Sequence, residues 1–198
     1  MKHIVVLGGV GLIGSHLCRT LIEDGHIVTC IDTRGVGASP ILHDVIYEER
    51  FHYIHHDITT PFEIDCDCII NLASPAAYYV GENLAATSLR TDILGTMNSL
   101  DVARQNNARI VYASSGDVYG LSYDRSFEEH IATSQPQNFE IEGKRAAEAL
   151  HKADFGDSRI ARIFNTYGSG SSLSDRRVIP SMILDALYNR DITIYGSG

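Results

Sequence analysis

The chain alternates short, continuous runs of apolar and β-branched residues with longer stretches in which apolar residues recur every three or four positions. The short runs are typical of strands, and the longer stretches are typical of amphipathic helices. Strands are predicted at residues 3–7, 27–31, 51–55, 68–72, 109–113 and 159–164, with a last short strand at 192–195. Helices are predicted at residues 11–24, 82–105, 139–153 and 178–188.

This alternation determines the fold class that we expect. Strands separated by helices of this length form a parallel sheet with right-handed crossovers. The strand runs are apolar throughout, as expected when helices cover both faces of the sheet. The sequence therefore predicts an α/β fold, a Rossmann-type doubly wound parallel sheet with helices on both faces. The long helix over 82–105 is expected to be interrupted once, at Gly95.

A glycine-rich loop lies between the first predicted strand and the first predicted helix. Gly8, Gly11 and Gly14 fit a G-x-x-G-x-x-G spacing, and Gly9 with the last two also fits G-x-G-x-x-G. Such glycines permit the tight turn, the approach of the backbone to a pyrophosphate and close helix–strand packing. The helix N-terminus offers N–H groups to the phosphates. The alternative is a glycine-rich turn that binds no ligand.

Other strand ends supply candidate contacts for a dinucleotide. Asp32 follows the glycine loop at the expected separation, where its carboxylate can accept both ribose hydroxyls. It would repel a 2′-phosphate and so favours NAD over NADP, a preference that Arg34 weakens slightly. Asp57 can reach the adenine amino group, or it can serve as a turn or capping residue. The small residues at 73–74 would let a cofactor lie against the backbone.

Composition excludes several classes of function. Of 198 residues, 44% are hydrophobic and 21% charged, and Lys plus Arg (16) against Asp plus Glu (25) gives a net charge of −9. Disorder is excluded, and an acidic chain does not favour a nucleic-acid partner. No apolar run is long enough for a membrane helix, so no membrane partner is expected. The four cysteines predict reduced thiols and a cytoplasmic location. Cys66-x-Cys68 lacks the second pair of a closed zinc site, and no metal is expected.

Several strings resemble one enzyme family. They are LASPA at 72–76, EGKR at 142–145, ARIFNTYG at 161–168, RV at 177–178 and YGSG at 195–198. With them the chain resembles, over all its residues, the extended short-chain dehydrogenase/reductase superfamily that acts on nucleotide sugars, most closely its UDP-glucuronic acid decarboxylase branch. The resemblance implies an NAD-binding Rossmann domain at 1–168 and the start of a C-terminal nucleotide-sugar lobe at 169–198. Family members continue further, so the lobe is expected to be truncated.

The resemblance also implies a mechanism and a departure from it. In the family, NAD takes a hydride from sugar C4 to give a 4-keto intermediate, and a Tyr-x-x-x-Lys pair supplies the base. Lys144 matches the lysine, but Glu140 occupies the tyrosine position. An exposed carboxylate is a weak base unless burial raises its pKa. Three alternatives remain: an enzyme that uses Glu140 or another base, an impaired relative with an ordinary i,i+4 Glu–Lys pair, or an engineered or misaligned position.

The resemblance assigns roles to further residues. Ser115 matches the catalytic Ser/Thr, unless it only satisfies backbone groups at a strand end, and Asp117 matches a catalytic acid, unless it is a turn residue. Asp92 stands where the family usually has Asn. Substrate contacts are expected from Asn165 and Arg177. Cofactor contacts are expected from Gly8, Gly11, Leu12, Ile13, Gly14, Asp32, Asp57, Ile58, Leu72, Ala73, Ser74, Thr91, Lys144 and Thr166.

The expected partners follow from the same resemblance. The substrate is expected to be a nucleotide sugar, with a UDP-sugar as the first choice. A homodimer is expected through the helices at 82–105 and 139–153. Two other functions stay open: a module that binds NAD or a partner without turnover, and a nucleotide-sugar dehydratase or epimerase. An NADPH-dependent reductase of small carbonyls would need a 2′-phosphate pocket, which Asp32 opposes.

Overall fold

The structure is a computed structural model that describes residues 1–75, 81–120, 139–154, 156–171 and 177–194. Its sheet contains β1 (His3–Leu7), β2 (Ile27–Asp32), β3 (Phe51–His55), β4 (Cys68–Asn71), β5 (Arg109–Ser115) and β6 (Ser158–Ile163). Its helices are α1 (Leu12–Glu23), α2 (Gly81–Arg90), α3 (Thr96–Asn106), α4 (Phe139–Asp154) and α5 (Val178–Leu187). Short helical turns are η1 (Val36–Ala38), η2 (Pro40–Leu42), η3 (Thr91–Gly95) and η4 (Gly116–Tyr119).

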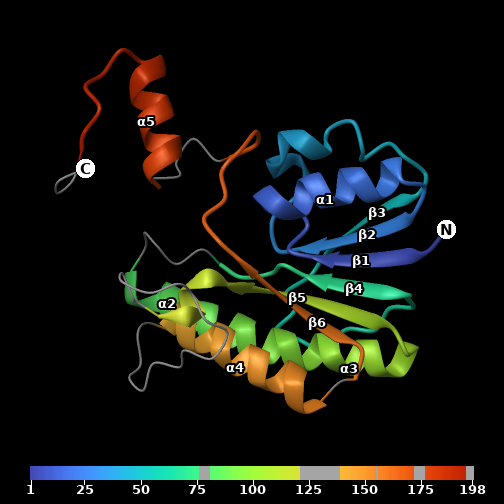
Figure 1. Cartoon of the computed structure of the whole chain (residues 1–198). Helices are drawn as coiled ribbons and strands as arrows, with labels where there is room; N and C mark the ends of the chain where they lie inside the picture. The colour runs from blue at the N-terminus through green and yellow to red at the C-terminus, as the bar shows by residue number, and fades with distance from the viewer. Residues whose placement is uncertain (76–80, 121–138, 155, 172–176, 195–198) are drawn as a thin grey trace.

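The six strands form one parallel sheet in the order β3-β2-β1-β4-β5-β6. The α1 helix lies on one face, and α2, α3 and α4 lie on the other (Figure 1). The predicted Rossmann-type fold is therefore confirmed. The strand order reverses between β1 and β4, and in sheets of this kind ligands bind outside the carboxyl ends of the strands at that point.

Each face of the sheet has its own apolar core. Val6 and Val28 pack with Cys18 of α1 on one face, and Val5 and Leu100 belong to the cluster on the other. All of these side chains are buried. This two-sided burial explains why the strands are apolar at successive positions rather than at alternate ones. The four cysteines are free, as expected.

The predicted helix over 82–105 is indeed interrupted near Gly95. The α2 helix passes into the π-helical turn η3, and α3 continues from Thr96. A side chain at Gly95 would overlap Ile58, which packs directly against this position. Single π turns within helices are frequent at functional sites, and this one includes the buried Asp92.

The expected last strand is wrong. Residues 191–194 have no regular secondary structure and are exposed, and Tyr195 lies outside the described residues. A strand needs a neighbouring strand to satisfy its backbone groups, and none of the described strands pairs with this segment. Residues 123–136, for which the sequence predicts a polar loop after β5, lie outside the described residues. The division of the chain at residue 168 stays a prediction.

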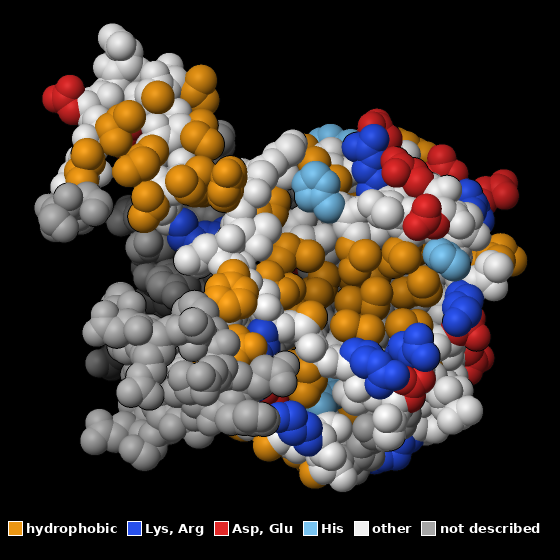
Figure 2. All heavy atoms as spheres, in the orientation of Figure 1, with side chains coloured by type: hydrophobic (Ala, Val, Ile, Leu, Met, Phe, Trp, Pro, Cys, Tyr) orange, Lys and Arg blue, Asp and Glu red, His pale blue; other side chains and the backbone are white. Residues whose placement is uncertain are grey.

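The α5 helix lies apart from the sheet (Figure 1). Figure 2 shows hydrophobic side chains gathered on it, and Val178, Ile183 and Leu187 are at least half exposed, at 63%, 50% and 76%. Within the described part of the chain, no helix combines the length and apolar character needed to cross a membrane.

Candidate functional site

The glycine loop is built by close backbone contacts. Gly8 has φ +75°, and a Cβ there would lie 2.8 Å from the Cα atom of Ala73. A Cβ at Gly14 would overlap the Gly8 carbonyl oxygen. The loop thus turns directly from β1 into α1 and passes against the end of β4. Because its glycines carry no side chains, the surface of the loop consists of backbone atoms.

The N-terminus of α1 suits an anion. Gly11 is its N-cap, no side chain caps it, and its first turn contains no acidic residue. The N-terminal N–H groups and the helix dipole therefore remain available for a phosphate. Leu12 and Ile13 begin this helix, and their contacts with a cofactor stay predictions. The glycine loop and the helix N-terminus together fit the pyrophosphate of a dinucleotide such as NAD.

Asp32 ends β2 beside this loop. Its Oδ2 accepts a 2.9 Å hydrogen bond from the Val10 N–H, and its Oδ1 accepts one of 2.9 Å from the Arg34 N–H. The Arg34 Nε atom lies 3.6 Å from Oδ1, and the Arg34 side chain is 56% exposed. The carboxylate thus fastens the glycine loop to β2. Each of its oxygens has a second lone pair, so acceptance from ribose hydroxyls is compatible with this geometry and stays a prediction.

The other predicted cofactor residues line the same sheet edge or support it. Asp57 Oδ1 accepts a 2.9 Å bond from the Thr59 N–H, so the alternative turn role is present in the structure. Ile58 is buried and packs against η3. The Thr91 hydroxyl donates to the carbonyl of Thr87 at 2.9 Å. The contact of Asp57 with adenine remains a prediction.

The segment after β4 extends the strand ladder toward the site. Leu72 donates its N–H to the Leu7 carbonyl at 2.9 Å, and the Ala73 N–H donates to Asn71 Oδ1 at 3.1 Å. The Ser74 hydroxyl is buried and lies close enough to Asp92 to lower the pKa of that carboxyl. These residues lie where the sequence placed them, opposite the glycine loop.

Ser115 and Asp117 lie at the carboxyl end of β5. The Ser115 hydroxyl accepts a 3.1 Å bond from the Asp117 N–H and so begins the turn η4. This is the strand-end role that the sequence left open for Ser115. The Asp117 side chain is exposed beyond the strand end. Both residues therefore combine a local structural role with a position at the edge where ligands bind in this fold.

Lys144 makes the central contacts of the site. Its Nζ atom lies 3.0 Å from Asp92 Oδ1 and donates to the Ala113 carbonyl at 3.0 Å. It also lies 5.0 Å from the centre of the Tyr112 ring. The lysine side chain is only 8% exposed. Within the described residues, Lys144 forms its ion pair with Asp92 and not with Glu140. The sequence did not predict this pairing.

Asp92 is a buried carboxylate with one satisfied oxygen. Tyr112 also approaches Oδ1, at 3.3 Å, whereas Oδ2 is buried without a hydrogen-bond partner among the described residues. Burial raises the pKa of Asp92, against the opposing effects of Lys144, Ser74 and Tyr112. Gly143 makes room for this carboxylate, because a Cβ there would lie 2.8 Å from Oδ2.

Glu140 is half-buried at the first turn of α4. Burial raises the pKa of its carboxyl, Lys144 lowers it, and the negative charges of Asp92 and Asp117 raise it further. Glu140 is therefore not the ordinary exposed partner of an i,i+4 pair. It meets the condition that the sequence set for a carboxylate acting as a proton carrier, namely burial that raises its pKa.

A second polar cluster lies behind the site, and sequence reasoning missed it. Arg162 of β6 binds both carboxylate oxygens of Glu148, at 2.9 and 2.8 Å, and the Ser114 hydroxyl donates to the same carboxylate at 2.6 Å. Glu148 follows Lys144 by four residues, so both side chains lie on the inward face of α4. This spacing is the signal that could have found it.

His151 extends the same face of α4. It is 1% exposed, its Nδ1 atom lies 2.7 Å from the Ser158 hydroxyl, and its ring stacks on Tyr112 with centroids 4.9 Å apart. Its Nε2 atom has no partner among the described residues. Burial lowers the pKa of His151 to about 4, against an opposing effect of Glu148.

We expect His151 to make the protein lose stability in mild acid. The unfolded chain protonates this histidine near its ordinary pKa of 6.5, whereas the folded chain does so only near 4. Stability present above pH 6.5 is therefore lost as the pH falls toward 4, by on the order of 3 kcal/mol. Urea unfolding of wild type and His151→Gln across this range measures the loss as a difference, in which the contributions of other groups cancel.

The control for this experiment is His43→Gln, because His43 is exposed. Because an exposed side chain contributes little to the packing of the fold, this variant should unfold with nearly the stability of wild type. A difference between His151→Gln and wild type that stays constant from neutral pH to about pH 4 would contradict the prediction, since it would mean that the folded and unfolded chains bind the His151 proton equally.

The predicted substrate residues lie after β6 and before α5. Asn165 and Thr166 are exposed, and the Thr166 hydroxyl donates to the Phe164 carbonyl at 2.9 Å. Arg177 is the N-cap of α5. The described chain after Thr166 passes beside α1, where His16 Nε2 lies 2.8 Å from the Ser169 carbonyl oxygen. The substrate roles of these residues stay predictions.

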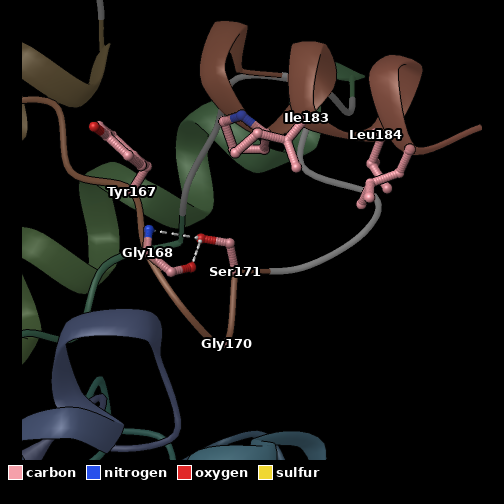
Figure 3. Close-up of a pocket in the computed structure, with 8 residues that line it drawn as sticks. Tyr167, Gly168, Gly170, Ser171, Ile183 and Leu184 are labelled. Carbon is pink, nitrogen blue, oxygen red and sulfur yellow. Dashed lines mark hydrogen bonds between the residues drawn. The ribbon is translucent and has the colours of Figure 1, made fainter.

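A pocket opens between this segment and α5 (Figure 3). The Ser171 hydroxyl holds its turn through bonds with the carbonyl and the N–H of Gly168, at 2.8 and 3.3 Å. The lining is otherwise largely apolar and consists of Tyr167, Gly168, Gly170, Ser171, Pro180, Ile183, Leu184 and Leu187. In the described part of the chain, no group of three or more His, Cys, Asp or Glu side chains is arranged to hold a metal ion.

Comparisons with known proteins show what this chain is similar to. Residues 4–198 match the NAD dependent epimerase/dehydratase family. The chain is 38% identical over 205 aligned positions to UDP-glucuronic acid decarboxylase 1 of Danio rerio, covering 100% of this chain and 49% of that protein. It is 34% identical to UDP-glucuronic acid decarboxylase 3 of Arabidopsis thaliana, covering 99% and 60% of the two chains. The chain thus spans about half the length of the first of these relatives.

Solved structures show the same fold. With a TM-score of 0.86 and 25% identity, the chain resembles UDP-N-acetylglucosamine 4-epimerase from Methanobrevibacter ruminantium M1, determined in complex with UDP-N-acetylmuramic acid, over 100% of this chain and 66% of that one. UDP-glucuronic acid 4-epimerase from Bacillus cereus, determined in complex with NAD, has a TM-score of 0.80 and 24% identity over 99% and 67%.

Proposed function

The chain belongs to the NAD-dependent epimerase/dehydratase family, and on that premise we propose that it converts a nucleotide sugar, with decarboxylation of UDP-glucuronate as its reaction. The observation that carries this proposal is the half-buried Glu140, whose pKa responds to the charges of Lys144 and Asp117 at the carboxyl end of β5, the same sheet edge that bears the glycine loop. The family is NAD-dependent, and the glycine loop with the α1 N-terminus fits that cofactor. The names of the relatives support the choice of substrate.

Each residue of the proposed site has a chemical task. When bound, NAD would accept a hydride from a sugar carbon and return it at the end of the cycle. Glu140 takes the proton of the hydroxyl on that carbon, because its raised pKa makes it a stronger base than an exposed carboxylate. Ser115 binds the resulting carbonyl oxygen. The bond to the sugar's carboxylate then breaks, carbon dioxide leaves, and the electron pair of that bond passes toward the carbonyl. A proton from water is added to the carbon that lost the carboxylate, and protonated Glu140 returns its own proton to the oxygen when the hydride comes back.

A second candidate is a relative that binds NAD without turnover. Two contacts favour it: Asp92 already holds the Lys144 ammonium, and the Ser115 hydroxyl already accepts a backbone bond. A dehydratase or epimerase endpoint is a third candidate, since it would use the same oxidised sugar. These alternatives differ in product, so one assay separates them.

We expect Glu140→Ala to lower turnover of UDP-glucuronate by about 100-fold, the usual contribution of a positioned acid–base group. The measurement is mass spectrometry of the sugar nucleotide after incubation with the purified chain and NAD. Loss of carbon dioxide identifies decarboxylation, loss of water identifies dehydration, and an isomer of unchanged mass identifies epimerisation. The matched control is Glu142→Ala on the same helix, which should retain activity.

Glu140→Tyr completes the test. Activity in the wild type shows that Glu140 or a neighbour supports the chemistry, and its loss in Glu140→Ala assigns that role to Glu140. Activity only in Glu140→Tyr would contradict the proposed role of Glu140 while leaving the rest of the site intact. If wild type and variant bind NAD and neither converts the sugar, the binding module is the better description.

The homodimer is part of the same proposal. Support comes from apolar side chains that stay exposed on the helices concerned: Leu94 at 42%, Met97 at 48% and Phe139 at 62%. Apolar side chains grouped on one helical layer are typical of an interface. Light scattering on the preparation used for the assay measures its mass against the 21.8 kDa of one chain.

A further inference from the structure

Three charged side chains from two elements meet behind the end of β5. Asp92 belongs to the π turn η3, and Glu140 and Lys144 belong to α4, which packs against that turn. The ammonium lies 3.0 Å from Asp92 Oδ1. It forms no ion pair with Glu140, which is also among the described residues. Two negative charges thus compete for one buried positive charge, and the structure shows which of them pairs with it.

Several contacts hold the Lys144 ammonium beside the Asp92 carboxylate. The ammonium is held from a second side by the Ala113 carbonyl at 3.0 Å, and Tyr112 adds a 3.3 Å bond to the same Asp92 oxygen. The carboxylate is 1% exposed, so moving the lysine away would leave a buried charge without a partner. Gly143 leaves the space into which Asp92 fits.

We propose that Asp92 is a positioning residue: it fixes the Lys144 ammonium against β5 and thereby keeps that charge from pairing with Glu140. Glu140 then retains its proton to higher pH than it would beside a free lysine. The role of Glu140 as proton carrier rests on the proposed function. The preference of the Lys144 ammonium for Asp92 over Glu140 does not, since it can be measured without cofactor or substrate.

The surroundings of Glu140 bear on this interpretation. From η3 it is faced by Asp92, from η4 by Asp117 and from its own helix by Lys144. Asp117 raises the pKa of Glu140 through its charge, yet its own side chain is exposed, whereas that of Asp92 is buried. Arg90, the basic residue at the end of α2, is also exposed. Asp117 is therefore a matched control for Asp92.

The test is a double-mutant cycle with the titration of Glu140 as its readout. The full chain is labelled with ¹³C-glutamate, and the carboxyl resonance of Glu140 is assigned by its absence in Glu140→Gln. Its titration midpoint is followed in wild type, Asp92→Asn, Lys144→Gln and the double variant. No cofactor or sugar is added, so the result is independent of turnover.

We expect a non-additive cycle. Asp92→Asn should move the Glu140 midpoint to lower pH, because the lysine charge becomes available to Glu140. Lys144→Gln should change the midpoint little in the wild type, since the unpaired Asp92 takes up a proton and both charges disappear together. In the Asp92→Asn background the same change should move the midpoint clearly upward. Asp117→Asn should combine additively with Lys144→Gln.

An equal upward shift from Lys144→Gln in both backgrounds would overturn the proposal, because the lysine would then act on Glu140 as an independent charge. A second measurement covers the case in which Lys144→Gln does not fold. The ammonium protons of Lys144, detected through its ¹⁵N resonance, should exchange slowly with water in the wild type. They should exchange faster in Asp92→Asn, which is nearly isosteric. Unchanged exchange would also contradict the proposal.

Activity supplies a separate comparison. If the chain decarboxylates UDP-glucuronate, the acid limb of its pH–rate profile should move to lower pH in Asp92→Asn. If no turnover is found and the cycle is non-additive, the proposed function fails and the positioning role of Asp92 stands. If turnover is found and the cycle is additive, the positioning role fails alone.

Discussion

Gly14→Ala is expected to abolish NAD binding at accessible concentrations and to destabilise the fold. The new Cβ would overlap the Gly8 carbonyl oxygen and lie 2.7 Å from the Gly9 Cα atom. Both obstacles are backbone atoms, so no side-chain rotation relieves them. The glycine loop must move, and the phosphate-binding N–H groups of α1 lose their alignment with it. Overpacking of this kind costs about 1–3 kcal/mol of stability.

The affinity effect should be larger than the stability effect, at least about 100-fold, because several phosphate contacts depend on one backbone geometry. Calorimetric titration with NAD measures it, and thermal unfolding measures the accompanying loss of stability. Gly35→Ala is the matched control, since a Cβ there has no heavy atom within 4 Å. A Gly14→Ala chain that folds and binds NAD as tightly as wild type would contradict the assignment of this loop to the cofactor.

Glu148→Ala is expected to cost about 3–5 kcal/mol of the free energy of unfolding, the usual penalty for breaking a buried ion pair. The substitution removes the acceptor of both Arg162 bonds, at 2.9 and 2.8 Å, and of the 2.6 Å bond from Ser114. The Arg162 side chain is only 20% exposed, so water replaces these bonds poorly. Since a domain is stable by about 5–15 kcal/mol, this loss is a large share of the total.

Urea unfolding at neutral pH measures this loss. The matched control is Glu23→Ala on α1, which also removes a helical glutamate paired with an arginine, but one whose side chain is 60% exposed. Because exposed pairs of this kind contribute little, the control should lie within about 1 kcal/mol of wild type. Equal stabilities of the two variants would show that the Glu148 cluster contributes nothing beyond a surface pair. Glu148→Gln should fall between Glu148→Ala and wild type, because an amide retains part of the hydrogen bonding.

The same cluster contributes to pH dependence. Burial raises the pKa of Glu148, but hydrogen bonds from Arg162 and Ser114 outweigh it, and the net effect lowers that pKa. The folded chain therefore releases this proton more readily than the unfolded chain does. The stability that Glu148 contributes is present above its ordinary pKa and is lost as the pH falls through the lower folded value.

The fold followed from local patterns in the sequence. Apolar runs with helices between them were sufficient for the parallel sheet, and the turn from β1 into α1 needed its glycines at fixed spacing. The expected strand at 192–195 failed for a different reason. Its apolar residues carried the right pattern, but a strand also requires a neighbour, and the sequence of one segment does not contain that information.

The position of the site in the fold could be predicted from the sequence better than the contacts among its side chains. Ser115 lies at the end of β5, as its motif predicted, and Lys144 of α4 reaches the same strand through the Ala113 carbonyl. The pairing of Lys144 with Asp92 could not be anticipated, because the π turn changes which side chain of that helix faces inward. The Glu148–Arg162 contact joins a helix to a strand, although helical spacing from Lys144 would have placed Glu148 on the correct face.

The π turn also governs which changes of length this chain tolerates. Each residue of an α-helix turns the chain by about 100°, so deleting one residue between Thr91 and Gly95 would rotate all of α2 relative to α3. Asp92 would leave its place opposite Lys144 while every remaining side chain kept its chemical identity. At this point of the fold, a codon lost or gained is therefore more consequential than most single exchanges of one amino acid for another.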